Sequence, residues 1–261
     1  MPRDMFYLLR VNFYVVDILG VPGEIQKENR LWKLQPMIDM IRNHCRSLER
    51  KPRSSYSIDE QMIPFLGRCP VRQYVRNKPR PVDLKNFVLT TSEGKILDFE
   101  IYQGKLTPFE NKDLGLGASV ILHLSHTLPK ESYLSFDRYF STESLFDRLI
   151  SLEIYGTVTI MPNRLKKCNF LKDKQFKRGN SQKLVRNDGK VSVTKWMDNK
   201  SVLMISTACG SEPQGVVSRW EKSEKKHVEV PCPNVVGMYN QKMGGVDVCD
   251  QIIELLYFLD I

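Results

Sequence analysis

Residues 84–103 read LKNFVLTTSEGKILDFEIYQ, and this stretch decides the fold of the chain. Residues 84–91 and 96–103 are rich in β-branched and aromatic residues, and SEGK at 92–95 forms a glycine-containing turn between them. Two such runs joined by a short turn predict a β-hairpin. Residues 56–65, YSIDEQMIPF, have the same character and precede the hairpin. We therefore expect three strands in succession.

Helices and strands alternate after the three strands. Residues 114–128 predict a helix and residues 133–136 a strand. Residues 143–152 predict a second helix with Thr142 as its N-cap, and residues 155–160 a fifth strand. A strand meander followed by this alternation predicts an α/β fold with a mixed sheet and flanking helices. The order is that of an RNase H-like domain with an insertion after the fifth strand.

We divide the chain into four parts. They are a helical N-terminal segment at 1–50, the first part of an RNase H-like core at 51–163, a basic β-rich insertion at 164–232, and the start of the closing helix of the core at 233–261. In the last part, residues 238–245 predict a turn-rich lead-in and residues 246–258 a helix.

Positive charge is concentrated in two stretches. The chain holds 39 Lys and Arg against 30 Asp and Glu, and residues 164–200 alone hold twelve basic and three acidic residues. Clustered charge of one sign indicates a polyanionic partner, most simply nucleic acid, although a solvated polar face is the alternative. The candidate DNA-binding residues are Arg68, Arg72, Arg76, Lys78, Arg80, Arg164, Lys166, Lys167, Lys172, Lys174, Lys177 and Arg178.

The composition excludes several classes of protein. Hydrophobic residues make up 41% and charged residues 26% of the chain, as in ordinary globular proteins. No run approaches the roughly 18 apolar residues of a membrane span, so we expect no membrane partner. Six cysteines without a CxxC pair are too sparse for a disulfide scaffold, which favours a reducing compartment.

Four acids occupy strand ends or helix starts in the predicted fold. Asp59 lies in the first strand, Asp137 ends the fourth, and Asp247 and Asp250 open the last helix. In an RNase H-like sheet the first and fourth strands are neighbours and a late helix crosses them, so these acids can meet. Carboxylates held together repel each other unless a cation neutralises them, and Mg²⁺ prefers oxygen ligands. A surface or capping role is the alternative for each acid taken alone.

Six stretches in this order resemble the piggyBac transposase-derived family. The combination covers nearly the whole chain and is highly specific, whereas one stretch alone would not be. The stretches are SIDEQMIPF at 57–65, GRCPVRQYVRNKP at 67–79, DFEIYQGK at 98–105, SFDRYFS at 135–141, GTVTIMPNR at 156–164 and MYNQKMGGVDVCDQ at 238–251.

The resemblance implies an RNase H-like catalytic domain that cuts and rejoins DNA. It implies that Asp59, Asp137 and Asp247 are the catalytic triad and bind metal, with Asp250 as a further metal-binding acid. The implied cofactor is Mg²⁺ or Mn²⁺ as two ions, which Asp59 bridges while Asp137 and Asp247 each hold one. The implied partner is double-stranded DNA with terminal repeats and TTAA targets, touched by the insertion. A nuclear location and a dimer are implied as well.

The sequence departs from the family pattern at two positions. Arg138 stands where Asn is usual, and Asp83 where Gly is usual. Arg138 is placed to pair with Asp137 and to weaken metal binding. In the family the helix that begins at GGVD, residues 244–247 here, continues into further helices, so the resemblance implies that the closing helix is truncated. Truncation would leave apolar sheet surface uncovered and make the chain poorly stable or dependent on a partner. We therefore favour a DNA-binding protein with a remnant strand-transfer site that is not active by itself. The alternatives are an active Mg²⁺-dependent transposase or nuclease that cuts at terminal repeats, and a truncated fragment without function.

Overall fold

The predicted hairpin and the strand before it lie in a nine-stranded sheet. We describe a computed structural model that places residues 1–17, 19–65, 67–74, 82–110, 112–165 and 168–258. β1 (Ser55–Ile63) runs antiparallel to β3 (Val82–Thr91), which pairs with β4 (Ile96–Ile101). The turn between β3 and β4 contains Gly94 at φ +87°, a backbone conformation that glycine adopts without strain. The short β2 (Arg72–Tyr74), which we did not predict, also pairs with β3.

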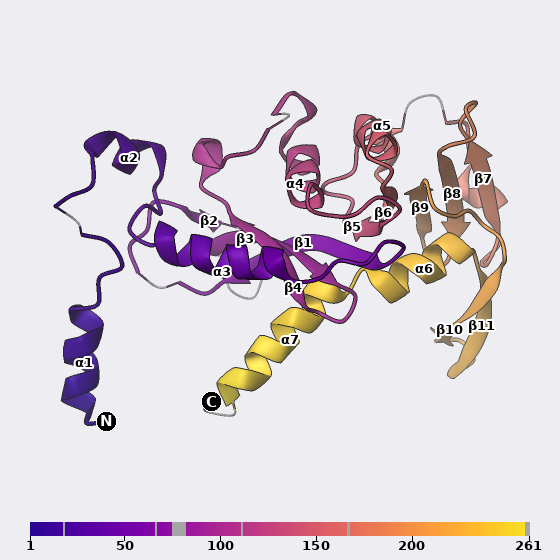
Figure 1. Cartoon of the computed structure of the whole chain (residues 1–261). Coiled ribbons are helices and arrows are strands. Elements are labelled where there is room, and N and C mark those ends of the chain that lie inside the picture. The colour runs from indigo at the N-terminus through magenta and orange to yellow at the C-terminus, as the bar shows by residue number, and fades with distance from the viewer. Residues whose placement is uncertain (18, 66, 75–81, 111, 166–167, 259–261) are drawn as a thin grey trace.

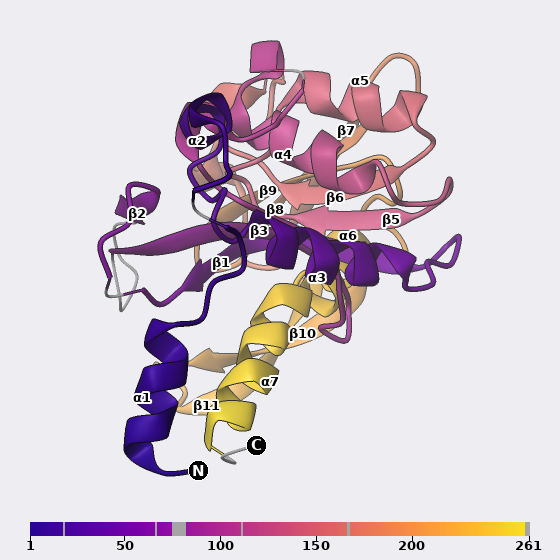
Figure 2. The ribbon, with the colours of Figure 1, turned by 60° about the vertical axis from the view of Figure 1, so that its left-hand side comes forward.

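The α/β alternation follows as predicted. β5 (Tyr133–Phe136) pairs in parallel with β1, and β6 (Tyr155–Thr159) pairs in parallel with β5. α4 (Leu116–Ser125) and α5 (Glu143–Ser151) connect these strands and cover one face of the sheet (Figures 1 and 2). Thr142 caps α5, because its hydroxyl accepts a hydrogen bond from the Leu145 N–H at 3.3 Å.

The segment predicted as an insertion contributes five strands. β9 (Ser201–Ser206) pairs antiparallel with β6, and β8 (Ser192–Met197) and β7 (Ser181–Val185) continue the main sheet to its edge. β10 (Gly215–Glu221) and β11 (Lys226–Cys232) form a separate antiparallel pair. Three of the five strands therefore belong to the main sheet. The boundaries of the four predicted parts stay a prediction.

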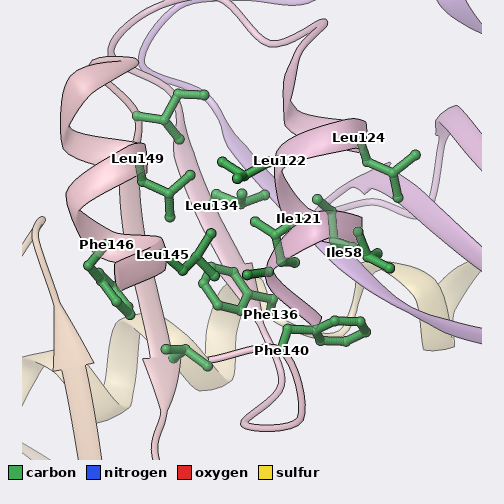
Figure 3. Packing of buried hydrophobic residues seen from close by; sticks show 14 of the residues in the cluster. Ile58, Ile121, Leu122, Leu124, Leu134, Phe136, Phe140, Leu145, Phe146 and Leu149 are labelled. Atoms are coloured by element: carbon green, nitrogen blue, oxygen red, sulfur yellow. The ribbon is translucent and has the colours of Figure 1, made fainter. Parts of the chain in front are cut away.

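The main hydrophobic core lies between the sheet and the helices α4 and α5 (Figure 3). Ile58 of β1 and Phe136 of β5 point into it and meet Ile121, Phe146 and Leu149 of the two helices, all fully buried. Each such side chain stabilises the fold by about 1.5–3 kcal/mol. Because side chains alternate between the faces of a strand, the residue after Ile58 and the residue after Phe136 face the opposite side of the sheet.

Two helices lie on that opposite side, α6 (Asn234–Lys242) and α7 (Gly245–Phe258), as Figures 1 and 2 show. The predicted helix at 246–258 is confirmed. The predicted turn-rich lead-in is wrong, because most of it belongs to α6. Its Gly, Asn and Gln residues favour turns locally, but Val235 and Val236 are buried against a second apolar cluster around Trp196 and so hold the helix.

The N-terminal segment forms α1 (Arg3–Val11), α2 (Gly23–Glu28) and α3 (Gln35–Ser47). α3 lies along β4, and Cys45 is its one buried residue. The remaining elements are short 3-10 turns at Gly104–Leu106, Lys112–Leu114, Pro162–Arg164 and Asp173–Gln175.

Ion pairs attach α3 to β4. Arg42 donates from Nε to Asp98 Oδ1 at 2.7 Å, and Arg46 donates from Nε to Asp98 Oδ2 at 2.9 Å. Arg42 also binds Glu100, whose carboxylate lies 3.2 Å from Nε2 of His123 on α4.

Among the described helices none is both long and apolar enough to cross a membrane.

Candidate active site

The parallel pair β1 and β5 brings two of the predicted acids together. Ile58 and Phe136 are register partners, and Asp59 and Asp137 follow them directly. Both carboxylates therefore lie at neighbouring positions on the side of the sheet that α6 and α7 cover. Asp59 lies within β1, whereas Asp137 is the first residue after β5, as the sequence predicted.

Asp247 reaches the same place from the first turn of α7. The helix can approach the sheet because residue 245 is glycine. A Cβ atom at Gly245 would lie 2.3 Å from the carbonyl oxygen of Thr91 and 2.4 Å from the hydroxyl of Ser57, far inside normal contact distance. The sequence showed the paired glycines before Asp247 but not this reason for them.

The charges of the three acids act on one another. Burial, above all, together with the charges of Asp137 and Asp247, raises the pKa of Asp59 to about 6. The Glu60 N–H, which donates to Asp59 Oδ1 at 2.8 Å, opposes this shift. Within the described part of the chain, no Lys, Arg or His forms an ion pair with any of the three acids. A negative charge on Asp59 is therefore costly as the site stands.

Tyr239 of α6 borders the acids, and we did not predict it. Burial raises the pKa of its phenol, and the nearby charge of Asp137 adds to the shift. The hydroxyl therefore stays protonated and donates to the carbonyl oxygen of Phe136 at 3.3 Å. The only sequence signal for this residue was its place in the stretch 238–251.

Asp250 binds an amide side chain of β1. Its Oδ1 accepts a hydrogen bond of 2.7 Å from Nε2 of Gln61 on β1. Gln61 Oε1 in turn accepts one of 3.1 Å from Nδ2 of Asn86 on β3. The sequence placed Asp250 on the same helix as Asp247 but gave no indication of these two amide partners.

Arg138 does not pair with Asp137. Its side chain is exposed, and the ion pairs of the described residues do not include it. Its carbonyl oxygen accepts a hydrogen bond of 2.6 Å from Nη1 of Arg164, which also binds the carbonyl of Ser141 at 2.7 Å. The expected weakening of the site by an Arg138–Asp137 ion pair is therefore wrong. Arg164, a candidate DNA-binding residue, holds the loop after Asp137.

The other candidate DNA-binding residues fall into three groups. Arg178 is engaged internally, since it donates to Asp198 at 3.1 Å and to Glu221 at 2.8 Å. Arg68, Arg72, Lys172, Lys174 and Lys177 are exposed. Outside the described residues lie Arg76, Lys78, Arg80, Lys166 and Lys167.

The donor chemistry of the three acids fits a hard divalent cation. Asp59, Asp137 and Asp247 offer carboxylate oxygens, the ligands that Mg²⁺ and Mn²⁺ prefer. Burial first, and the charges of Asp137 and Asp247 second, raise the pKa of Asp59, and a cation would offset both effects. Yet no group of three or more His, Cys, Asp or Glu side chains in the described ranges is arranged to hold one ion. The acids are neighbours without forming a closed ligand set.

A cavity among the described residues lies elsewhere. It measures about 610 Å³ and lies between α5 and the strands β7 to β9. Its walls include Phe146, Val193 and Ile205, and it contains none of the four acids. Because its walls are largely apolar, it is not the site of the carboxylate chemistry.

Comparisons with known proteins agree with this fold. A family model described as Transposase IS4 matches residues 1–258. The human PiggyBac transposable element-derived protein 3 is 31% identical over 262 residues, which cover 97% of this chain and 43% of that protein. The human PiggyBac transposable element-derived protein 2 is 30% identical over 260 residues, covering 96% of this chain and 43% of that protein.

A solved structure has the same fold. The cryo-EM structure of a piggyBac transposase synaptic complex with hairpin DNA matches with a TM-score of 0.79 at 22% identity, and the match covers 97% of this chain and 51% of that one. The sheet and its flanking helices thus have the predicted RNase H-like fold, and the family match makes this a transposase-type domain. The chain belongs to the piggyBac transposase-derived family. It spans less than half the length of the two human relatives.

Proposed function

We propose that this chain is a transposase-derived DNA-binding protein that keeps a divalent-metal site at Asp59, Asp137 and Asp247. The observation that carries the proposal is the meeting of three carboxylates from β1, β5 and α7 beside one another. Burial and mutual repulsion raise the pKa of Asp59 to about 6, and no basic side chain of the described residues neutralises the group. A cation would offset these charges.

The chemistry follows from the donor set. Two bound Mg²⁺ or Mn²⁺ ions stabilise the attacking and leaving oxygens of a phosphodiester displacement. Because the charges of Asp137 and Asp247 both act on Asp59, Asp59 would serve both ions, while Asp137 and Asp247 would each hold one. Tyr239 keeps the Phe136 carbonyl fixed next to Asp137 through its protonated hydroxyl.

Exposed basic side chains support binding to double-stranded DNA. Lys172, Lys174 and Lys177 follow β6 in sequence, and Arg68 and Arg72 follow β1. Such side chains bind phosphates and give affinity without reading sequence. The similar solved structure is a complex with hairpin DNA. From the family resemblance we further propose terminal repeats and TTAA targets as the DNA, a dimeric assembly and a nuclear location.

The DNA-binding part is tested by salt dependence. Binding of a fluorescent DNA duplex is measured by anisotropy over a range of salt concentrations. Replacing Lys172, Lys174 and Lys177 by Ala should weaken binding and reduce the slope of log affinity against log salt by about 2.7, or about 0.9 per lost phosphate contact. The matched control replaces three other exposed lysines, Lys27, Lys51 and Lys130. A flat salt response of the unaltered chain would refute DNA binding.

The metal part is tested by nicking of terminal-repeat DNA in Mg²⁺ or Mn²⁺, with Asp137→Ala as the control. Metal-dependent nicking that the substitution abolishes would support the active transposase or nuclease. DNA binding and Mn²⁺ binding without nicking would support the remnant site. A chain that binds neither DNA nor Mn²⁺ would refute the proposal and leave the fragment without function.

A further inference from the structure

The face of β1 that carries Asp59 also carries Ser57 and Gln61, because side chains alternate along a strand. α7 touches both ends of this row. Gly245 lies against Ser57, and Asp250 accepts the hydrogen bond of 2.7 Å from Gln61. α7 therefore contacts β1 on both sides of Asp59.

The hydrogen bond between Gln61 and Asp250 is part of a buried chain of hydrogen bonds. Gln61 and Asn86 are register partners on β1 and β3, and they are 7% and 5% exposed. Asn86 donates to Gln61 at 3.1 Å, and Gln61 donates to Asp250. Each bond fixes the rotation of the next amide, so the carboxylate of Asp250 receives a defined position on the sheet.

We propose that Gln61 and Asn86 are positioning residues, which fix α7 on the sheet through Asp250 and so hold Asp247 beside Asp59. Asp247 precedes Asp250 by three residues, so the two move together. A slip of α7 by one turn would displace Asp247 by about 5.4 Å. Mg²⁺ binds its oxygen ligands at about 2.0–2.1 Å in strict geometry, so such a slip would remove Asp247 from the site. This inference rests on the proposed function, because it concerns the acids proposed to bind metal.

The competing role for Asp250 is direct metal binding, as the resemblance implies. Exchanging donor and acceptor separates the two roles. In the double variant Gln61→Glu with Asp250→Asn, the new asparagine and Asn86 can both donate to the new glutamate, so both hydrogen bonds remain and the total charge is unchanged. The carboxylate moves from position 250 on α7 to position 61 on β1, while Asp247 is unchanged.

The test uses the full chain with two measurements, Mn²⁺ affinity by titration calorimetry and hydrogen exchange of the α7 amides by mass spectrometry. Gln61→Leu should lower Mn²⁺ affinity by about 10–100-fold, as loss of a group that orients a metal ligand does, and should speed exchange in α7. The double variant Gln61→Glu with Asp250→Asn should restore both the Mn²⁺ affinity and the slow hydrogen exchange of α7. Cys249→Ala is the matched control, since Cys249 is buried on α7 outside the hydrogen-bond chain. It should lower the melting temperature without lowering Mn²⁺ affinity.

Three results would overturn the inference. Gln61→Leu could leave both Mn²⁺ affinity and α7 exchange unchanged, or Cys249→Ala could lower the affinity as much as Gln61→Leu. The double variant could restore slow hydrogen exchange in α7 without restoring Mn²⁺ affinity, which would make Asp250 a metal ligand. If the unaltered chain binds no Mn²⁺, the metal part of the proposed function fails, and α7 exchange in Gln61→Leu alone decides whether the chain of amides positions the helix.

Discussion

Removing the carboxylate of Asp98 should release α3 from the sheet. The Asp98 side chain is fully buried and binds both Arg42 and Arg46, so Asp98→Ala leaves two guanidinium groups without their partner. Arg42 is 13% exposed and cannot recover much hydration, whereas Arg46 is 37% exposed and can. Arg42 keeps Glu100 as a second partner.

Asp98→Ala should lower the free energy that holds α3 on the sheet by about 3 kcal/mol. Breaking a buried ion pair by removing one partner costs about 3–5 kcal/mol, and the remaining Glu100 contact and the hydration of Arg46 place this case at the lower end. The buried apolar side chain of α3, Cys45, supplies less than the ~1.5–3 kcal/mol of a buried Leu or Val. The loss of the Asp98 ion pairs therefore exceeds the stabilisation that the buried Cys45 side chain still supplies. We expect α3 to detach while the sheet stays folded.

Hydrogen exchange measured by mass spectrometry separates local from global unfolding. Amides of α3 should exchange on the order of 100-fold faster in Asp98→Ala, because every ~1.4 kcal/mol corresponds to a factor of ten. Exchange in β1 and β3 should stay unchanged. The control is Glu131→Ala, which removes an ion pair of similar length, 2.8 Å, whose partner Arg53 is 75% exposed. Glu131→Ala should leave hydrogen exchange in α3, β1 and β3 unchanged.

Two results would refute this reasoning. Unchanged exchange in α3 would mean that the ion pairs do not hold the helix. Equal acceleration in α3 and in the strands would mean that α3 and the sheet unfold as one cooperative unit, so that the local estimate does not apply.

Three further predictions concern the site and α5. The pKa of Asp59 is raised from 3.8 to about 6, so the folded chain holds an extra proton between these values. The metal-free chain should therefore lose stability as the pH rises from about 4 to about 6, and Asp59→Asn should remove this dependence and raise the melting temperature at pH 7. Gly245→Ala should cost about 3 kcal/mol or more in urea unfolding, because the new methyl would overlap the Thr91 carbonyl, while Gly244→Ala, with open space around its Cβ position, should change stability by less than about 0.5 kcal/mol. Thr142→Ala should cost about 1 kcal/mol in the same assay through loss of the α5 cap, and no change would show that the cap is not stabilising.

The strands and helices with strong local patterns could be predicted from the sequence. The hairpin of β3 and β4, the strand β5 and the capped helix α5 each carry their own turn or capping residue beside an apolar run. β7, β10 and β11 were missed, because their exposed and less exposed positions do not separate into polar and apolar residues along the sequence. In β10, Val216 and Trp220 are exposed, whereas Arg219 and Glu221 are partly buried in ion pairs. In β11, Val228, Val230 and Cys232 face inward, and the residues between them are exposed. The composition there indicated only a basic β-rich segment.

The acids could be placed by element but not by partner. Asp59 and Asp137 follow core residues of adjacent strands, so their meeting follows once the strand order is right. The partner of Asp250 could not be predicted, because Gln61 lies 189 residues away and nothing local links the two. The internal engagement of Arg164 and Arg178 was hidden for the same reason, since charge counting does not show which carbonyl or carboxylate a guanidinium meets.

The long separation between Gln61 and Asp250 also affects the order in which the protein folds during its synthesis. At about 5–20 residues per second, a ribosome needs about 10–40 s to proceed through the 189 residues between them. During that interval β1, β3 and β5 can already pair, but the side of β1 that carries Asp59 has no helix to cover it. A nascent chain that has reached only β11 holds the exposed lysines of the segment after β6 and lacks Asp247. With the DNA binding proposed above, such a chain would bind a polyanion before all of its acids have been synthesised.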